Sequence, residues 1–156
     1  MGAKIISKLE NIHLTIKKLG LKITDKKKYY GKSFELGIPQ IDLNKLKDKI
    51  FGIENNLDEL NGIDFKKGCY VGQENTARIK LKEKLKKRLF AIKILEGKIN
   101  TEEITYEDKE IGKLLINNQN PFALIKFQSE NFNFEDNLKC GEAKIKVIKP
   151  KWLKLS

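Results

Sequence analysis

Residues 89–127 read LFAIKILEGKINTEEITYEDKEIGKLLINNQNPFALIKF, and this stretch decides the fold of the C-terminal half. Short runs rich in β-branched and aromatic residues alternate with turns that contain Gly, Asn, Asp or Pro, which is typical of antiparallel strands. The strands predicted in this stretch and beside it are 78–82, 89–95, 103–106, 111–116, 122–127 and 143–148. Their spacing indicates a small antiparallel barrel or sandwich.

The first 24 residues allow two readings. Apolar residues recur at helical spacings of four and three from Ile5 to Leu19, but they also alternate as in a strand from Ile12 to Ile23. Periodicity alone does not choose between the two. His13, the single histidine, lies in this apolar pattern, and we expect it to be structural or exposed rather than catalytic.

Residues 25–50 predict two short helices. A charged turn at 25–28 precedes a helix at 29–36, which Gly37 and Pro39 end. Asp42 is expected to cap a second helix whose apolar stripe is formed by Leu43, Leu46 and Ile50. The lysine run at 82–88 is expected to form a solvated hairpin turn.

These patterns predict an α+β fold in which short helical segments and a loop precede a small C-terminal antiparallel β-barrel. At 156 residues, the chain is long enough for one main core. We divide it into a helical region at 1–65, a loop at 66–78 and the barrel at 79–156.

The formal net charge of +11 suggests either a solvated basic surface or a polyanionic partner such as RNA. Only Arg78 and Arg88 of the 32 basic residues are arginine, so the planar group that reads guanine or clamps phosphate is scarce. The lysines are scattered along the chain. Their distribution favours the solvated surface over specific RNA recognition.

The sequence contains no apolar run long enough to cross a bilayer and no apolar block typical of a signal peptide. We therefore expect a cytoplasmic protein without membrane partners. Cys69 and Cys140 are expected to remain thiols in that compartment. No motif surrounds Cys140, which we interpret as structural.

The stretch KKGCYVGQENTAR, residues 66–78, combines a cysteine with two flanking glycines, Gly68 and Gly72. Glycines allow a sharply shaped, exposed loop. Neighbouring cations (Lys66, Lys67 and a folded-back Arg78) favour the thiolate, which acts as nucleophile or metal ligand. Tyr70, Gln73 and Glu74 offer a flat face, an amide and a carboxylate that could hold a polar heterocycle.

The alternative reading makes Cys69 a small buried apolar residue in a glycine-rich connection, and the pattern alone leaves both open. There is no CxxC pair, P-loop or GxGxxG string. The chain therefore cannot by itself form a four-cysteine cluster site, a zinc site or a nucleotide cradle, and we expect no stably bound metal.

The string KGCYVGQE at Lys67–Glu74 resembles the signature of the YgfZ family, folate-binding relatives of the glycine cleavage T-protein. The resemblance covers roughly residues 12 to 155, and it implies that residues 1–65 are a remnant of the family's central folate-binding α/β region. Further similar segments are GIPQI at 37–41, the run-in FGIENNLDELNGIDFKKGCY at 51–70, QENTARIK at 73–80 and IKVIKPKW at 145–152.

The resemblance implies roles for individual residues. Cys69 matches the critical cysteine of the family, and Lys67, Gly68, Tyr70, Gly72, Gln73, Glu74 and Arg78 match the rest of its signature. The resemblance puts Glu35 in the place of a pterin-binding glutamate, with Ser33 where an arginine is often found. Tyr70 would contribute to cofactor binding, and Cys69 could share a cluster with a partner protein.

The resemblance also implies a function. It suggests a factor that depends on tetrahydrofolate or a derivative and supports iron–sulfur cluster assembly or repair, including clusters of tRNA-modifying enzymes. Expected partners are iron–sulfur proteins or assembly factors, with tRNA involved indirectly. Members of the family carry an N-terminal α/β portion that has no counterpart here, so folate binding is in doubt, and pairing with a separate N-terminal half or self-association is expected.

Two alternatives remain at this point. One is a tetrahydrofolate-dependent aminomethyltransferase like the T-protein, which leaves open whether the chain is an enzyme. The other is a non-catalytic RNA-binding barrel whose affinity falls steeply with salt.

Overall fold

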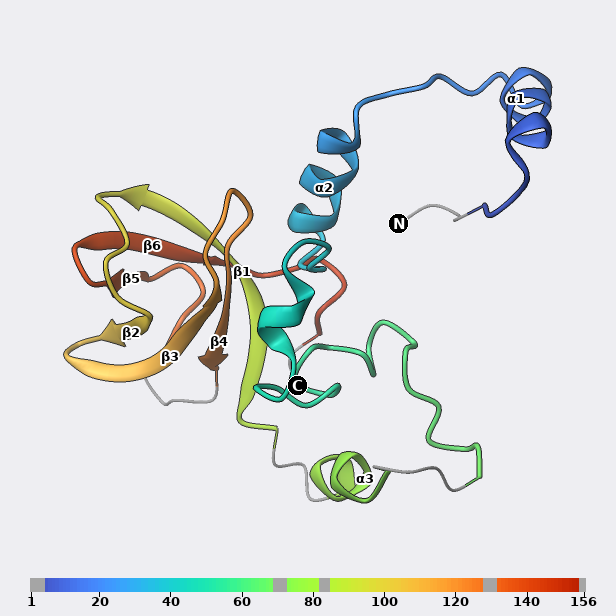
Figure 1. Cartoon of the computed structure of the whole chain (residues 1–156). Coiled ribbons are helices and arrows are strands. Elements are labelled where there is room, and N and C mark those ends of the chain that lie inside the picture. Colours follow the sequence, from blue (N-terminus) through green and yellow to red (C-terminus); the bar gives the residue numbers. More distant parts are fainter. Residues whose placement is uncertain (1–4, 69–72, 82–84, 128–131, 155–156) are drawn as a thin grey trace.

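Six antiparallel strands close into a barrel in the C-terminal half of the chain (Figure 1). The computed structural model describes residues 5–68, 73–81, 85–127 and 132–154. Round the barrel the order is β1-β4-β3-β2-β5-β6. The strands are β1 (Lys87–Glu96), β2 (Glu103–Tyr106), β3 (Lys109–Ile116), β4 (Phe122–Lys126), β5 (Asn137–Cys140) and β6 (Ala143–Ile148). The predicted α+β fold with a C-terminal antiparallel barrel is confirmed.

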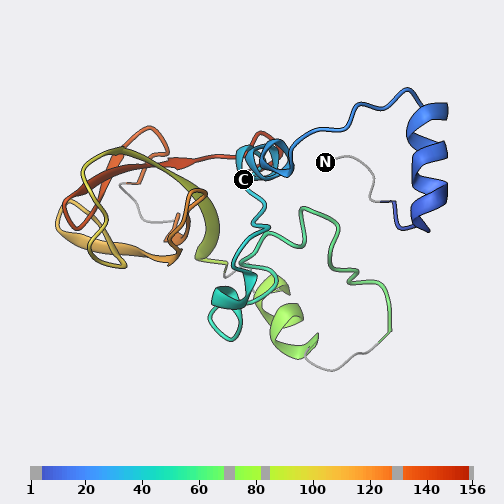
Figure 2. The same ribbon diagram turned by 45° about the horizontal axis from the view of Figure 1, so that its top comes forward.

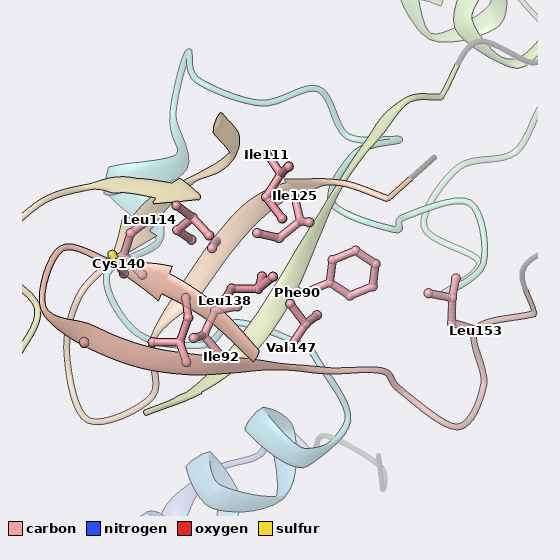
Figure 3. Close-up of a cluster of buried hydrophobic side chains, with 13 residues drawn as sticks. Phe90, Ile92, Ile111, Leu114, Ile125, Leu138, Cys140, Val147 and Leu153 are labelled. Atoms are coloured by element: carbon pink, nitrogen blue, oxygen red, sulfur yellow. The ribbon is translucent and has the colours of Figure 1, made fainter. Parts of the chain in front are cut away.

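Alternating side chains of β1 face opposite sides of the barrel wall. Phe90 and Ile92 point inward and join the main core with Leu138 and Val147 (Figure 3). Leu89 and Ala91 belong instead to a second cluster on the outer side. The inward-facing and the outward-facing side chains named here are all buried. The outer face of this part of β1 must therefore be covered by another part of the chain.

The helical region supplies that cover. It contributes Leu46, Ile50 and Phe34 to the outer cluster. The rings of Phe34 and Phe122 meet edge to face, with centroids 5.6 Å apart. Burying a side chain such as Leu46 contributes about 1.5–3 kcal/mol, so this contact attaches the helical region to the barrel.

The helices of the N-terminal half are α1 (Leu9–Lys18), α2 (Lys26–Glu35) and the short 3-10 helix η1 (Leu43–Leu46). The ambiguous first segment is thus partly helical, and no residue of α1 is buried. In both views α1 stands apart from the other elements (Figures 1 and 2). Its neighbourhood exposes large apolar side chains, including Ile6, Leu9 and Ile23.

α2 has well-defined ends. Asp25 caps its first turn by accepting a hydrogen bond from the Lys27 backbone N–H at 2.8 Å, so the residues expected to form a charged turn begin the helix. Gly37, with φ of 68°, ends it as predicted. Trp152 donates its Nε1–H to the Leu36 carbonyl at 2.8 Å, which satisfies a carbonyl at the helix end. A Cβ at Gly37 would also stand 2.6 Å from Pro150 Cγ, so the GIPQI and IKVIKPKW segments meet in space.

Two predictions for the middle of the chain are wrong. Residues Arg78 to Leu81 belong to a helix, α3 (Gln73–Leu81), and not to a strand. The lysine run therefore follows a helix and does not connect two strands, and its residues 82–84 lie outside the described residues. Its last residue, Arg88, is also not solvated, because it pairs with Glu59 and its side chain is 11% exposed.

Two smaller differences concern Asp42 and β5. Asp42 adopts a left-handed conformation, with φ of 58°, and makes no capping bond, so η1 is one short turn that ends before Ile50. The Asp42 carboxylate accepts instead from Asn118 Nδ2 at 2.9 Å. β5 was not predicted, because its four residues, NLKC, carry only two apolar side chains. Of the helices in the described part of the chain, none is long and apolar enough to cross a membrane.

Candidate functional site

The signature loop is described at its two ends. Cys69, Tyr70 and Gly72 lie outside the described residues. On the N-terminal side, the Lys66 backbone N–H donates to Asp64 Oδ1 at 2.9 Å, and Lys67 is exposed. At Gly68, no heavy atom lies within 4 Å of where a Cβ would stand, so this end of the loop borders open space.

On the C-terminal side, the loop leads directly into α3, whose first residue is Gln73. Glu74 and Arg78 are one helical turn apart, and Arg78 Nη2 lies 3.4 Å from Glu74 Oε1. Both side chains are largely exposed, at 85% and 62%. Such a pair contributes little to stability, about 0.3–0.5 kcal/mol, so Arg78 can exchange Glu74 for another anion at small cost.

The segment that precedes the loop is fixed to the barrel through Asn56. This residue is buried and left-handed, with φ of 60°. Its Nδ2 donates to the Leu89 carbonyl at 2.9 Å, and the Leu89 N–H donates to the Glu54 carbonyl at 2.8 Å. The run-in thus hydrogen bonds with β1 although more than thirty residues separate the two.

Arg88 completes this connection. Its Nη1 donates to Asn56 Oδ1 at 3.0 Å, and its Nη2 pairs with Glu59 Oε1. The guanidinium also lies over the Phe127 ring, 5.5 Å from the centroid. The side chain is 11% exposed, and removing one partner of such a pair costs far more than removing a surface pair. Arg88 therefore joins the run-in, the start of β1 and the end of β4.

α3 is attached to the same run-in. Lys80 Nζ pairs with Asp58 and lies 4.6 Å from the centroid of the Phe65 ring. Segments on both sides of Cys69 are thus tied to residues 54–65, which Asn56 and Arg88 hold against the barrel. The geometry places the two ends of the signature loop on one support.

Glu35 and the second cysteine lie elsewhere. Glu35 is exposed and pairs with Lys32 at 2.9 Å, and Figures 1 and 2 show α2 well apart from α3. Cys140 is fully buried in the barrel core, and its thiol donates to the Thr101 carbonyl at 3.2 Å. Burial raises the pKa of this thiol, so it stays protonated and unreactive at neutral pH. Its surroundings agree with a structural role.

Sequence reasoning did not identify Asn56 or Arg88 as parts of the site. One signal was available, because Arg88 is one of two arginines among 32 basic residues. Arginine is preferred where a buried cation must make several hydrogen bonds in one plane. Among the described residues, no three His, Cys, Asp or Glu side chains are grouped so that they could hold a metal ion.

The barrel is similar to a known domain family. Residues 86–155 match the CAF17 C-terminal β-barrel domain family. The chain is also similar to the iron–sulfur cluster assembly factor IBA57 homologue of Neurospora crassa, with 42% identity over 67 residues. The corresponding values are 40% over 73 residues for IBA57 of Mus musculus and 48% over 44 residues for IBA57 of Homo sapiens.

These matches cover 43%, 47% and 28% of this chain, and 15%, 20% and 12% of the three relatives. The chain thus corresponds to a minor part of each relative. All three relatives are named as mitochondrial proteins, which contradicts the expected cytoplasmic location. Residues 86–155 are thus similar to the CAF17 C-terminal β-barrel domain, and part of the chain is similar to IBA57 proteins, which are named as iron–sulfur cluster assembly factors.

Proposed function

We propose that this chain acts in iron–sulfur cluster assembly and that Cys69 is its functional thiol. The observation that carries the proposal is the similarity to IBA57 proteins, which are named as iron–sulfur cluster assembly factors. The mitochondrial names of these relatives also support a mitochondrial location for this chain. Its partners would be iron–sulfur proteins or other assembly factors.

The way the signature loop is supported agrees with this role. The run-in and α3 share contacts through Asp58 and Lys80, and Arg88 holds the run-in against the barrel. A thiol between two anchored segments can be presented to a partner with little loss of loop entropy on binding. A single thiolate could then complete the ligand set of a cluster that the partner holds.

Two finer features belong to the same proposal. One is dependence on tetrahydrofolate or a derivative, with Tyr70 and Glu35 among its contacts. The other is support for cluster enzymes that modify tRNA. Calorimetric titration of the chain with tetrahydrofolate tests the first feature, both alone and together with the part of a relative that the chain does not match. Micromolar binding supports folate dependence, and the absence of binding heat in both conditions contradicts it.

The central test is restoration of iron–sulfur enzymes in cells depleted of their own IBA57. The chain is expressed in mitochondria either alone or together with the part of the Neurospora relative that it does not match. We expect iron–sulfur enzyme activity to recover in at least one of these conditions, while enzymes without clusters stay unchanged. If the chain is present at normal abundance and neither condition restores activity, the proposal is wrong.

A further inference from the structure

A pocket lies on the outer face of the barrel, where the helical region meets the strands. Its volume is about 380 Å³. The residues that line it come from three strands and from the turn after η1: Lys87; Glu110, Gly112, Lys113 and Leu115; Leu124 and Lys126; and Lys49. Four of these described side chains are cationic and one is anionic, and Lys113 is paired with Glu102 outside the lining, so positive charge still exceeds negative charge among them.

Two of the lysines stand directly opposite each other. Lys87 of β1 is the register partner of Lys126 of β4. Like charges at opposed positions destabilise a sheet. Lys126 Nζ donates to the Glu110 carbonyl at 3.2 Å, which orients the amine but does not neutralise it. Within the described part of the chain, neither Lys49, Lys87 nor Lys126 is paired with a carboxylate.

Another opposed lysine pair of the barrel is treated differently. Lys93 of β1 is the register partner of Lys146 of β6, and Lys146 Nζ lies 2.6 Å from Glu135 Oε2. The fold thus neutralises one of these pairs internally. At Lys87 and Lys126 it leaves the positive charges facing a pocket, where an external anion can take the place of the missing carboxylate.

The floor of the pocket is apolar. It is formed by Leu115, which is nearly buried, and by Leu124, which is half-buried. At Gly112, a Cβ would stand 2.6 Å from both Ile125 Cδ1 and the Leu124 carbonyl oxygen, so glycine is required at this position of the pocket wall. An occupant that covers the floor therefore needs an aliphatic group as well as negative charge.

We propose that this pocket binds an acidic segment of a partner protein. One aliphatic side chain of the segment lies on Leu115 and Leu124, and flanking carboxylates face Lys49, Lys87 and Lys126. Nucleic acid fits less well, because the described residues of the lining include no aromatic ring on which a base could stack and a phosphate backbone offers no aliphatic group. Lysine ammonium groups, in turn, suit flexible carboxylates that need no fixed geometry.

The position of the pocket suggests what the contact achieves. Lys87 is the first residue of β1, and the chain before it leads back to α3 and the signature loop. Figure 1 shows the start of β1 on the side of the barrel where α3 lies. A partner held at the pocket would therefore stand near the start of β1, where the chain arrives from α3. The inference itself rests on the pocket and does not require the proposed function.

The test is a calorimetric titration of the full chain with a short synthetic peptide whose core is Asp-Glu-Leu-Glu-Asp. The chain offers a matched pair of variants. Lys87→Glu/Lys126→Glu reverses the pocket charges yet keeps like charges opposed, so the strand pairing is no worse than before. Lys139→Glu/Lys144→Glu makes the same change at the opposed pair of β5 and β6, which does not line the pocket.

We expect the peptide to bind, the pocket variant to weaken binding at least about tenfold, and the control variant to leave it within about threefold. Replacing the peptide's leucine by alanine is expected to weaken binding as well. The proposal is overturned if the peptide does not bind or if both variants weaken it equally. It is also overturned if an oligouridylate binds the wild type more tightly than the peptide and loses affinity in the pocket variant, because the site would then be for nucleic acid.

Discussion

Arg88 donates a hydrogen bond to Asn56 across 32 residues of sequence, with Nη1 and Oδ1 3.0 Å apart. Asn56 is 1% exposed and also donates to the carbonyl of Leu89, the residue that follows Arg88. One amide side chain thus holds the first residues of β1 against the run-in to the signature loop. Support for the loop depends on this contact more than on any surface ion pair nearby.

Substitution of Asn56 by glycine tests the contribution of these bonds. Glycine accepts the left-handed φ, so any loss of unfolding free energy reports the missing hydrogen bonds and the partner groups left unpaired, and not backbone strain. We expect the free energy of unfolding in urea to fall by about 2–4 kcal/mol. Asn61→Gly is the control, because Asn61 is also left-handed, with φ of 57°, but is exposed. Equal losses in the two variants would contradict the assignment.

Substitution of Gly37 by alanine tests the contact between the end of α2 and the C-terminal segment. A Cβ at Gly37 would lie 2.6 Å from Pro150 Cγ, and its φ of 68° is unfavourable for alanine. We expect the free energy of unfolding to fall by about 1–3 kcal/mol. The fluorescence of Trp152, the single tryptophan, should shift to the red.

The double variant Gly37→Ala/Pro150→Ala separates the two causes. Removing the proline ring relieves the clash but not the backbone strain. The double variant should therefore lose less unfolding free energy than the two single variants lose together. If Pro150→Ala and Gly37→Ala prove strictly additive, the two residues do not press on each other in solution.

The buried thiol of Cys140 should make stability depend on alkaline pH. Burial raises its pKa in the folded state, so the unfolded chain loses this proton first. The thiol therefore contributes stability below its unfolded pKa of about 8.5, and the contribution falls as the pH rises above that value. The measurement is the difference in unfolding free energy between wild type and Cys140→Ala from pH 7 to 10. A difference that does not shrink as the pH rises would show that the thiol ionises freely in the folded protein.

Asp42 should make the stability of the protein depend on acidic pH. The hydrogen bond from Asn118 lowers the pKa of its carboxyl, and Lys45 adds to this effect. A lowered folded pKa means stability that is present above the unfolded pKa of about 3.9 and is lost as the pH falls through the folded value. Asp42→Asn keeps a side chain that tolerates the left-handed conformation. Wild type should be the more stable protein at pH 7 and lose this advantage by pH 3, as followed by circular dichroism; a constant difference would count against the carboxylate's role.

The barrel could be predicted because most of its strands combine β-branched residues with turn residues at regular spacing. β2 and β6 begin and end where the sequence places them. The pattern failed at Arg78–Leu81, where apolar and charged residues alternate over too few positions to distinguish a strand from a helix. It also missed β5, whose pairing with β6 depends on the closed barrel and not on its own composition.

The candidate site was predictable in part. The unusual signature string located the loop, but its support arises from contacts that no local pattern contains. Asn56 gives no sign of its buried position, because left-handed asparagines usually occur in exposed turns. Its partner Arg88 lies at the end of a lysine run that suggests a solvated surface. The burial of Asn56 and Arg88 is explained only by the packing of the run-in on β1.

The most direct measurement of the central claim compares three forms of the chain in cells depleted of IBA57, under the condition that restores iron–sulfur enzymes. Cys69→Ala removes the proposed functional thiol, and Cys140→Ala removes the buried one as a control. We predict that Cys69→Ala abolishes the recovery of enzyme activity at unchanged protein abundance, whereas Cys140→Ala retains activity in proportion to its abundance. Full recovery with Cys69→Ala would contradict the account.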